Sequence, residues 1–322
     1  MQTYVNPYGG LPGAGSRWYK CNFHVHDVSP EDPGSFASIL KKYKAAGYDI
    51  IVNSGQKDFY DTRGAAAEAG ITTYKGQEYV EKDGILLIGT DRFISGTPQQ
   101  AVDACRAAGG FSVACHPGIA PWLLAEGGVF LTPADIAALK GLTGVEILNG
   151  CIPLVSMGGG ILGKAIEVGV WDGMLSQGVL VWGFGNDDYH SPHEINTAWT
   201  EIFARSDRYE DVRAAVSQGC LCASNGLRLK RFDFEGGVLT VWADYPIFLE
   251  NPGYIEEYPS FHDDIDYKFV GASGKVLSRQ SGTAVSLKIG GDEPYVRVEA
   301  RGADGASLWT QPLYRADAFK SN

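Results

Sequence analysis

The sequence predicts an α/β fold over residues 1–225 and a small antiparallel β domain, of sandwich type, over residues 226–322. In the first part, short β-type runs alternate with stretches of helical periodicity. This order is typical of a parallel sheet that is either closed into a barrel or doubly wound. In the second part, runs such as 238–242 and 295–299 alternate apolar and polar residues, as in antiparallel sheets that cover a core with one face.

Seven strands are expected in the α/β part, at residues 21–25, 49–53, 72–78, 111–115, 144–148, 179–183 and 220–223. Helical periodicity predicts helices between them, at residues 33–43, 99–108, 134–140 and 209–218. The third helix should begin at Thr132-Pro133, a capping residue followed by a first-turn proline. Asp83-Gly84 predicts a hairpin turn after the third strand.

The chain carries 27 basic and 38 acidic side chains, a net charge of −11 at pH 7, without a basic run. Because nucleic-acid binding needs a cationic surface, we expect no nucleic-acid partner. No apolar run approaches the ~18 residues of a membrane span, and the N-terminal residues lack the basic start and apolar stretch of a signal peptide. We therefore expect a cytoplasmic protein that acts on a small molecule without membrane contact. The sequence indicates no particular oligomeric state.

The six cysteines show no C-x-x-C spacing, and we expect them to be reduced and mostly buried. Their spacing does not support a structural thiolate metal site. Three consecutive glycines at residues 158–160 lack the strand and helix context of a dinucleotide-binding loop, so we expect no nucleotide cofactor.

Polar and metal-binding side chains follow successive predicted strands at one end of the sheet, where parallel α/β proteins assemble their sites. His24 and His26 are two residues apart, so on an extended strand both rings face the same way and can hold one cation. Further ligand candidates follow the neighbouring strands: Glu78, His116, Asp188 and His190. This mixture of imidazoles and carboxylates suits Zn, Mn or Fe better than Ca or Mg, and we expect one or two such ions.

Several motifs resemble those of the polymerase-and-histidinol-phosphatase (PHP) metallohydrolases, and most of all their carbaryl hydrolase-like branch. They are, in chain order, residues 17–26 (RWYKCNFHVH), 47–51 (GYDII), 76–78 (GQE), 114–117 (ACHP), 145–149 (VEILN) and 187–190 (DDYH). Later segments that also resemble this branch are 222–226, 295–299 and 309–312. The resemblance implies a distorted seven-stranded (β/α) barrel with metals at the C-terminal strand ends.

The same resemblance assigns roles to the ligand candidates. It implies that His24, His26 and Asp188 hold one metal, and that Glu78 bridges to a second metal held by His116. His190 matches the family's last histidine, which normally helps to bind a third metal. With Asp188, it is our candidate for catalysis, through proton transfer or contact with the leaving group.

The sequence departs from the family after the second strand. Where relatives carry Thr-Asp-His-Asn, residues 54–57 are SGQK, with Gly55 and Gln56 in place of two ligands of the third metal. Because neither residue binds metals well, we expect the third position to be vacant. Lys57 is either a contact for an anionic substrate or a solvent-facing lysine. The change puts phosphoesterase activity, though not the fold, in question.

The predicted function is hydrolysis of a small molecule, first of all a phosphoester, by a metal-activated water. One alternative is a metal-assisted reaction on a carbamate, amide, ester or glycan, and another is a degenerate relative that binds metal or ligand without turnover. Glu146 is expected to orient a histidine. The residues expected to contact substrate are Gln56, Lys57, Arg63, Asn149 and His193. The alternatives are a surface ion pair for Arg63 and a plain rim position for His193.

Overall fold

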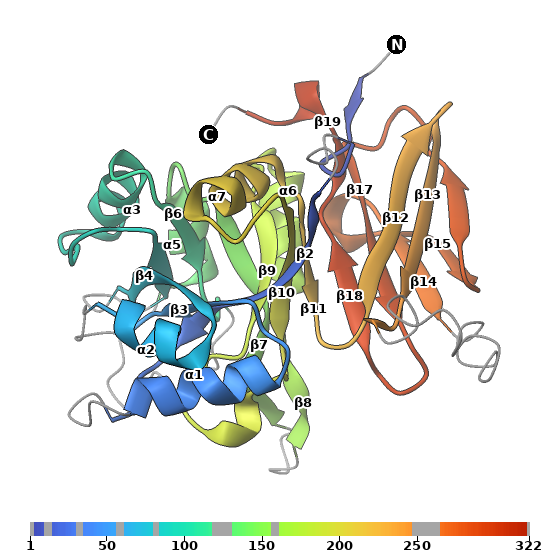
Figure 1. The fold of residues 1–322 in the computed structure, drawn as a ribbon. Helices are drawn as coiled ribbons and strands as arrows, with labels where there is room; N and C mark the ends of the chain where they lie inside the picture. Colours follow the sequence, from blue (N-terminus) through green and yellow to red (C-terminus); the bar gives the residue numbers. More distant parts are fainter. Residues whose placement is uncertain are drawn as a thin grey trace, which may run out of the picture.

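The computed structural model describes residues 3–9, 15–29, 35–55, 61–79, 84–117, 131–155, 161–246 and 265–320, with the backbone alone for 152–155 and 161–166. An α/β part and a β-rich part lie side by side (Figure 1). Apart from the N-terminal strand, the α/β part corresponds to the first two thirds of the chain, and the β-rich part to the rest.

The strands of the α/β part form one large sheet. In spatial order its strands are β11 (Leu221–Ser224), β10 (Trp199–Ala204), β2 (Arg17–Val25), β3 (Ile50–Asn53), β4 (Thr72–Glu78), β5 (Ile85–Ile88), β6 (Phe111–Ala114), β7 (Gly144–Val155) and β8 (Ile161–Ile166). β9 (Trp182–Asn186) also pairs with β7. The fully buried strands β3, β5 and β6 are mostly apolar, as expected for strands covered on both faces.

The sheet is mixed, so the prediction of a parallel sheet is wrong in part. β5 runs antiparallel to both β4 and β6. The short connection from Glu78 to Ile85 leaves no room for the crossover that a parallel pairing of β4 and β5 would need. β10, which the periodicity did not indicate, is antiparallel to β2 and β11. The sixth predicted strand is also displaced, since residues 179–183 were expected and β9 covers Trp182–Asn186.

The large sheet curls until the segment after β9 meets the end of β2. The backbone N–H of His26 donates to the carbonyl of Tyr189 at 3.2 Å, and the N–H of Tyr189 donates to the carbonyl of His24 at 3.3 Å. This pairing brings residues near 188 beside residues near 25. Because β10 and β11 continue the same sheet, the pairing does not establish the predicted count of seven strands.

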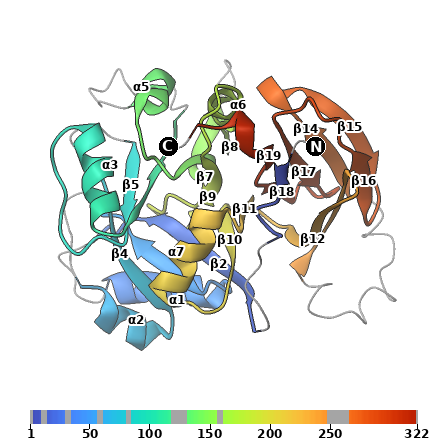
Figure 2. The ribbon, with the colours of Figure 1, turned by 90° about the horizontal axis from the view of Figure 1, so that it is seen from above.

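The helices surround the strands of the α/β part (Figure 2). They are α1 (Ser35–Ala45), α2 (Arg63–Ala69), α3 (Pro98–Ala107), α5 (Pro133–Ala138), α6 (Val168–Ser176) and α7 (Tyr209–Gln218). The four predicted helices are confirmed as α1, α3, α5 and α7. Thr97 and Thr132 cap α3 and α5 with reciprocal capping boxes, as expected at Thr132. In the described parts of the chain, no helix is long and apolar enough to cross a membrane.

The β-rich part is antiparallel, as predicted, and the large sheet continues into it. β18 (Ser307–Thr310) pairs with β11, and beyond it lie β17 (Tyr295–Arg301), β14 (Asp266–Val270), β15 (Val276–Ser281), β19 (Leu313–Arg315) and β1 (Tyr4–Val5). A second sheet consists of β12 (Arg228–Glu235), β13 (Val238–Asp244) and β16 (Val285–Lys288). One apolar core contains side chains of both sheets, among them Phe232, Leu239, Val298 and Leu308. The domain boundary at residue 225 stays a prediction.

Candidate metal centre

The predicted metal ligands come together at one end of the large sheet. Because β5 reverses the chain direction between β4 and β6, strands β2, β4, β6 and β9 all run the same way. Their C-terminal ends therefore lie on one side. His24 and His26 lie at the end of β2, and Glu78 lies at the end of β4. His116 follows β6, and Asp188 follows β9. All five side chains are buried.

Three imidazoles face two carboxylates in this cluster. Nε2 of His24 lies 3.1 Å from Oδ1 of Asp188 and 3.6 Å from Oε1 of Glu78. Nε2 of His26 lies 3.3 Å from the same Asp188 oxygen and 3.4 Å from Oε2 of Glu78. Nε2 of His116 lies 2.9 Å from Oε1 of Glu78. Glu78 thus lies between His116 and the pair His24–His26, as a bridging ligand would.

Two buried nitrogen atoms in the cluster make no hydrogen bond to the described residues, namely Nε2 of His24 and Nε2 of His26. Nδ1 of His24 lies 3.1 Å from Oε1 of Glu146. Since a carboxylate only accepts hydrogen bonds, this contact assigns the ring proton to Nδ1 and leaves a lone pair on Nε2. Histidines that bind metals are typically held by a carboxylate in this way. The donor set therefore fits a divalent transition metal.

Glu146, in β7, connects several strand ends beneath the cluster. Besides His24, its carboxylate accepts hydrogen bonds from the backbone N–H of His116, from Nδ2 of Asn149 and from Nδ2 of Asn186, each 2.9 Å long. The contact of Glu146 with His24 agrees with the expectation that Glu146 orients a histidine, and this role stays a prediction.

The cluster holds three buried carboxylates, those of Glu78, Glu146 and Asp188. Burial raises the pKa of Glu78, but the imidazoles of His24 and His116 outweigh this effect and hold the pKa well below its usual range. Burial lowers the pKa of His116, but Glu78 outweighs it and raises the pKa to about 9. The pKa of His24 is raised too, because Asp188, Glu146 and Glu78 offset its burial. The carboxylates thus attract cationic charge, which either protons on the histidines or a metal ion can supply.

Two of the predicted ligand residues have an uncommon backbone conformation. His116 has a φ of 32° and Asp188 a φ of 53°, in the left-handed region of backbone conformation that residues other than glycine rarely adopt. Such conformations persist where surrounding bonds hold them, and they are often found at functional sites. The N–H of His116 is held by Glu146, and Oδ2 of Asp188 accepts from Nδ2 of Asn149 at 3.1 Å.

Two cysteines lie at the cluster although their spacing gave no reason to expect a thiol there. Sγ of Cys115 lies 3.4 Å from Oε1 of Glu78, and Sγ of Cys151 lies 3.8 Å from Nδ1 of His190. Cys115 belongs to a group of potential ligand atoms with His24, Glu78 and His116. The position of Cys115 directly before His116 is the one sequence feature that could have indicated it.

The residues predicted to contact substrate lie less close together than the predicted metal ligands. Asn149 is buried, and its side chain is bonded to Glu146 and Asp188. The side chain of Arg63 is 84% exposed and forms an ion pair with Asp61, in agreement with the alternative of a surface ion pair. His193 lies in the short 3-10 turn Pro192–Glu194, beside Ser191. Gln56 and Lys57 lie outside the described residues.

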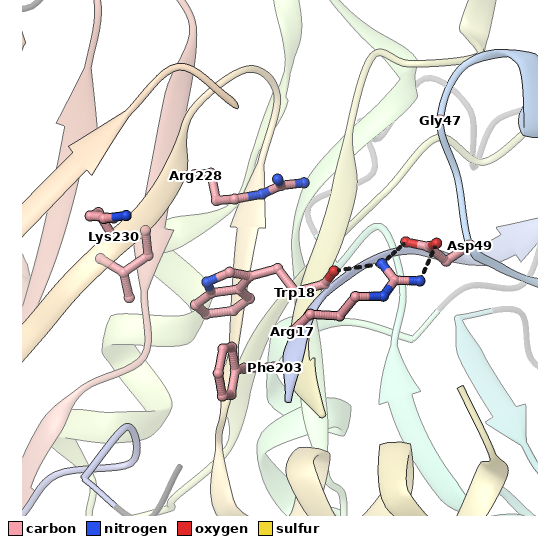
Figure 3. Close-up of a pocket in the computed structure, with 8 residues that line it drawn as sticks. Arg17, Trp18, Gly47, Asp49, Phe203, Arg228 and Lys230 are labelled. Atoms are coloured by element: carbon pink, nitrogen blue, oxygen red, sulfur yellow. Dashed lines mark hydrogen bonds and ion pairs between the residues drawn. The ribbon is translucent and has the colours of Figure 1, made fainter. Parts of the chain in front are cut away.

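A cavity of about 510 Å³ lies away from this cluster, at the start of β2 (Figure 3). Trp18 and Phe203 form its aromatic wall, and three cationic side chains line it: Arg17, Arg228 and Lys230. Arg17 is paired with Asp49 at 2.8 Å, and Arg228 with the buried Glu201 at 2.8 Å. Because carboxylates offset most of its positive charge, the cavity attracts an anion only weakly.

No protein-family model and no curated protein matches the sequence. Among solved structures, the fold is similar to that of a two-domain protein from Bacteroides vulgatus that contains a predicted PHP-like metal-dependent phosphoesterase. The TM-score is 0.51 at 15% sequence identity, and the match covers 97% of this chain and 99% of the other. The chain therefore shares its two-part fold with a PHP-like protein.

Two further structures match less closely. PsfC from Pseudomonas syringae matches with a TM-score of 0.40 at 11% identity, over 62% of this chain and 87% of that chain. An amidohydrolase from Chromobacterium violaceum with bound sulfate and no metal matches with a TM-score of 0.35 at 15% identity, over 54% of this chain and 89% of that chain.

Proposed function

We propose that this chain is a metal-dependent hydrolase of PHP type, close to the carbaryl hydrolase-like branch, and that its substrate is a small phosphoester. The observation that carries the proposal is the pair of buried Nε2 atoms of His24 and His26, which face carboxylates without a hydrogen-bond partner among the described residues. The fold shared with the Bacteroides protein, and the predicted phosphoesterase that this protein contains, support the same class.

In this proposal each residue of the cluster has a separate task. His24, His26 and Asp188 would hold one Zn, Mn or Fe ion, and Glu78 would be shared with a second ion held by His116. Such ions lower the pKa of a bound water and polarise the substrate. Glu146 keeps the His24 proton on Nδ1.

His190 is the group that exchanges a proton with the leaving group in this proposal. Its side chain is 54% exposed, and its ring centroid lies 4.5 Å from that of His26, so it reaches both the solvent and the cluster.

The charge of the centre favours a second candidate substrate class. Glu78, Glu146 and Asp188 place three carboxylates within one small cluster. These groups repel a phosphoester dianion unless bound ions offset their charge, whereas a carbamate, amide, ester or glycan carries no such charge. Turnover rates of phosphoesters and of uncharged substrates, measured side by side, therefore decide between the two substrate classes.

A panel of chromogenic substrates tests both candidates. Aryl phosphate mono- and diesters, aryl esters, aryl carbamates, anilides and aryl glycosides are each offered to protein loaded with Zn, Mn or Fe. We expect phosphoester turnover that is lost with a chelator and in Glu78→Gln, but not in Glu201→Gln, which alters a buried carboxylate outside the centre. Turnover of an uncharged substrate alone establishes the second candidate. A loaded protein that turns over no substrate contradicts the enzyme proposal and leaves a metal-binding protein.

A further inference from the structure

Cys151, His190 and Asp188 form a group of potential ligand atoms beside the proposed metal centre. Sγ of Cys151 lies 3.8 Å from Nδ1 of His190, and this nitrogen lies 3.6 Å from Oδ1 of Asp188. With the bond lengths of tetrahedral zinc, neighbouring sulfur, nitrogen and oxygen ligands lie roughly 3.4–3.6 Å apart. These two distances are thus close to the spacing of ligands around one zinc ion, and all three atoms lie within 4.8 Å of one another.

The backbone holds Cys151 in this place. Its N–H donates to Oδ1 of Asn149 at 2.9 Å. The preceding residue, Gly150, lies so close to the segment after β9 that a Cβ there would come within 2.1 Å of Oγ1 of Thr197 and 2.9 Å of Cα of Asp187. The glycine therefore lets β7 approach that segment and brings the thiol to His190.

This part of the centre is open to solvent, since the side chain of His190 is 54% exposed. Five of the six cysteines are buried, and Cys151 is the only one that is partly exposed. Nδ1 of His190 also lies 3.0 Å from the carbonyl of Asp188, a hydrogen bond that the ring gives up when Nδ1 binds a cation. Because the ring is half exposed, Nε2 then keeps the ring proton on the solvent side. His190 is then a ligand, in place of the proton-exchange role that the proposed function gives it.

We propose that Cys151, His190 and Asp188 bind a zinc-type ion beside the ion held by His24 and His26, with Asp188 shared between the two. This inference rests on the proposed function, which supplies the neighbouring ion. It also changes the expectation that the third position is vacant, since Cys151 supplies a ligand that the altered residues after the second strand do not. A soft thiolate selects zinc or cobalt over manganese and magnesium, so this position discriminates between the metals that the other ligands accept.

The sulfur provides a spectroscopic test that is independent of activity. Cobalt replaces zinc, and a bound thiolate gives a sulfur-to-cobalt charge-transfer absorption in the near ultraviolet. We expect this band in the cobalt-loaded full chain, its loss in Cys151→Ser, and its retention in Cys115→Ser, which removes the other thiol at the centre. Elemental analysis should show one zinc ion fewer in Cys151→Ser than in the natural protein.

A second measurement needs no variant. Burial raises the pKa of the Cys151 thiol to about 12, so the alkylation is run at alkaline pH, where the thiolate forms. Cys151 of the intact metal-free protein should then react with a small alkylating reagent, as located by mass spectrometry, and zinc but not manganese should protect it. Three results would each overturn this inference while the proposed function stands. They are cobalt that binds without a thiolate band, a band that is lost only in Cys115→Ser, and a Cys151 that stays reactive in the presence of zinc. If no metal binds at all, both proposals fail.

Discussion

At the scale of single residues, His24 shows how the fold orients a proposed metal ligand. Its Nδ1 is held by Glu146 from β7, so its Nε2 faces Glu78 and Asp188 from two other strand ends. The gathering of these side chains could be predicted from the sequence, because a histidine or carboxylate at a strand end is conspicuous there. Cys151 could not, because only the close approach allowed by Gly150 brings its sulfur to the cluster.

Replacing Glu146 tests this arrangement. In Glu146→Gln, the amide can donate a hydrogen bond to Nδ1 of His24 and so favours the wrong tautomer for binding through Nε2. We expect a loss of roughly 10–100-fold in affinity for zinc, measured by competition with a chelating dye. Glu201→Gln, a matched change of a buried carboxylate, should keep the natural affinity. Equal affinities for all three proteins would show that Glu146 does not position the ligand.

The metal-free protein should also lose stability as the pH rises. The pKa of His116 is raised from 6.5 to about 9, so its protonated form stabilises the fold fully below pH 6.5, and this contribution is lost as the pH rises through 9. The pKa values of Glu78 and Asp188 are lowered, so their contributions do not change in this range. In a chelator, the unfolding temperature should therefore fall between pH 6.5 and 9. With zinc, which takes the place of the protons, the fall should be smaller. A metal-free unfolding temperature that stays level or rises would contradict this assignment.

At the scale of elements, a helix or strand could be predicted where its own sequence carries a clear apolar pattern or a capping signal. The four helices with a clear apolar stripe or a capping signal could be predicted, whereas the short α2 and the Gly-containing α6 have neither. β10 could not be predicted, because its sequence WTEIFA is short and lies directly after a loop of polar residues. The antiparallel course of β5 follows from the length of one connection rather than from its own composition.

The glycine in β4 shows how closely the strands approach near the centre. A Cβ at Gly76 would lie 2.4 Å from Cγ1 of Val52 in β3 and 3.2 Å from the carbonyl oxygen of Leu87 in β5. We expect Gly76→Ala to lower the free energy of unfolding by about 1–3 kcal/mol. Gly173→Ala in α6, where nothing lies within 4 Å of the added carbon, should raise it by roughly 0.5–1 kcal/mol. Urea unfolding of both variants checks the pair, and a neutral Gly76→Ala would show that the two strands can separate.

At the scale of the whole molecule, a buried ion pair joins the two parts. Arg297 of β17 donates to both oxygens of Asp172 in α6, at 2.8 and 2.7 Å, and both side chains are almost fully buried. Tyr295 donates to the same carboxylate at 3.0 Å. With the pairing of β18 and β11, this contact makes the β-rich part continuous with the α/β part. The sequence predicted the antiparallel strands but not this connection, since the two partners are far apart in the chain.

Breaking this pair should destabilise the whole chain. Arg297→Leu leaves the Asp172 carboxylate buried without its cation, and we expect a loss of about 3–5 kcal/mol in the free energy of unfolding. The double variant Arg297→Leu with Asp172→Asn should recover part of it. Lys41→Met, which breaks the exposed ion pair with Glu68, should leave the urea midpoint unchanged. An Arg297→Leu protein as stable as the natural one would mean that the two parts do not depend on this contact.

The most direct test of the metal centre is anomalous X-ray diffraction from crystals grown with zinc. Data collected on both sides of the zinc absorption edge locate the ion without reference to activity. We predict an anomalous peak bonded to Nε2 of His24, Nε2 of His26 and the carboxylate of Asp188. Crystals saturated with zinc that show no peak at these three residues, or a peak only elsewhere on the chain, would contradict the account.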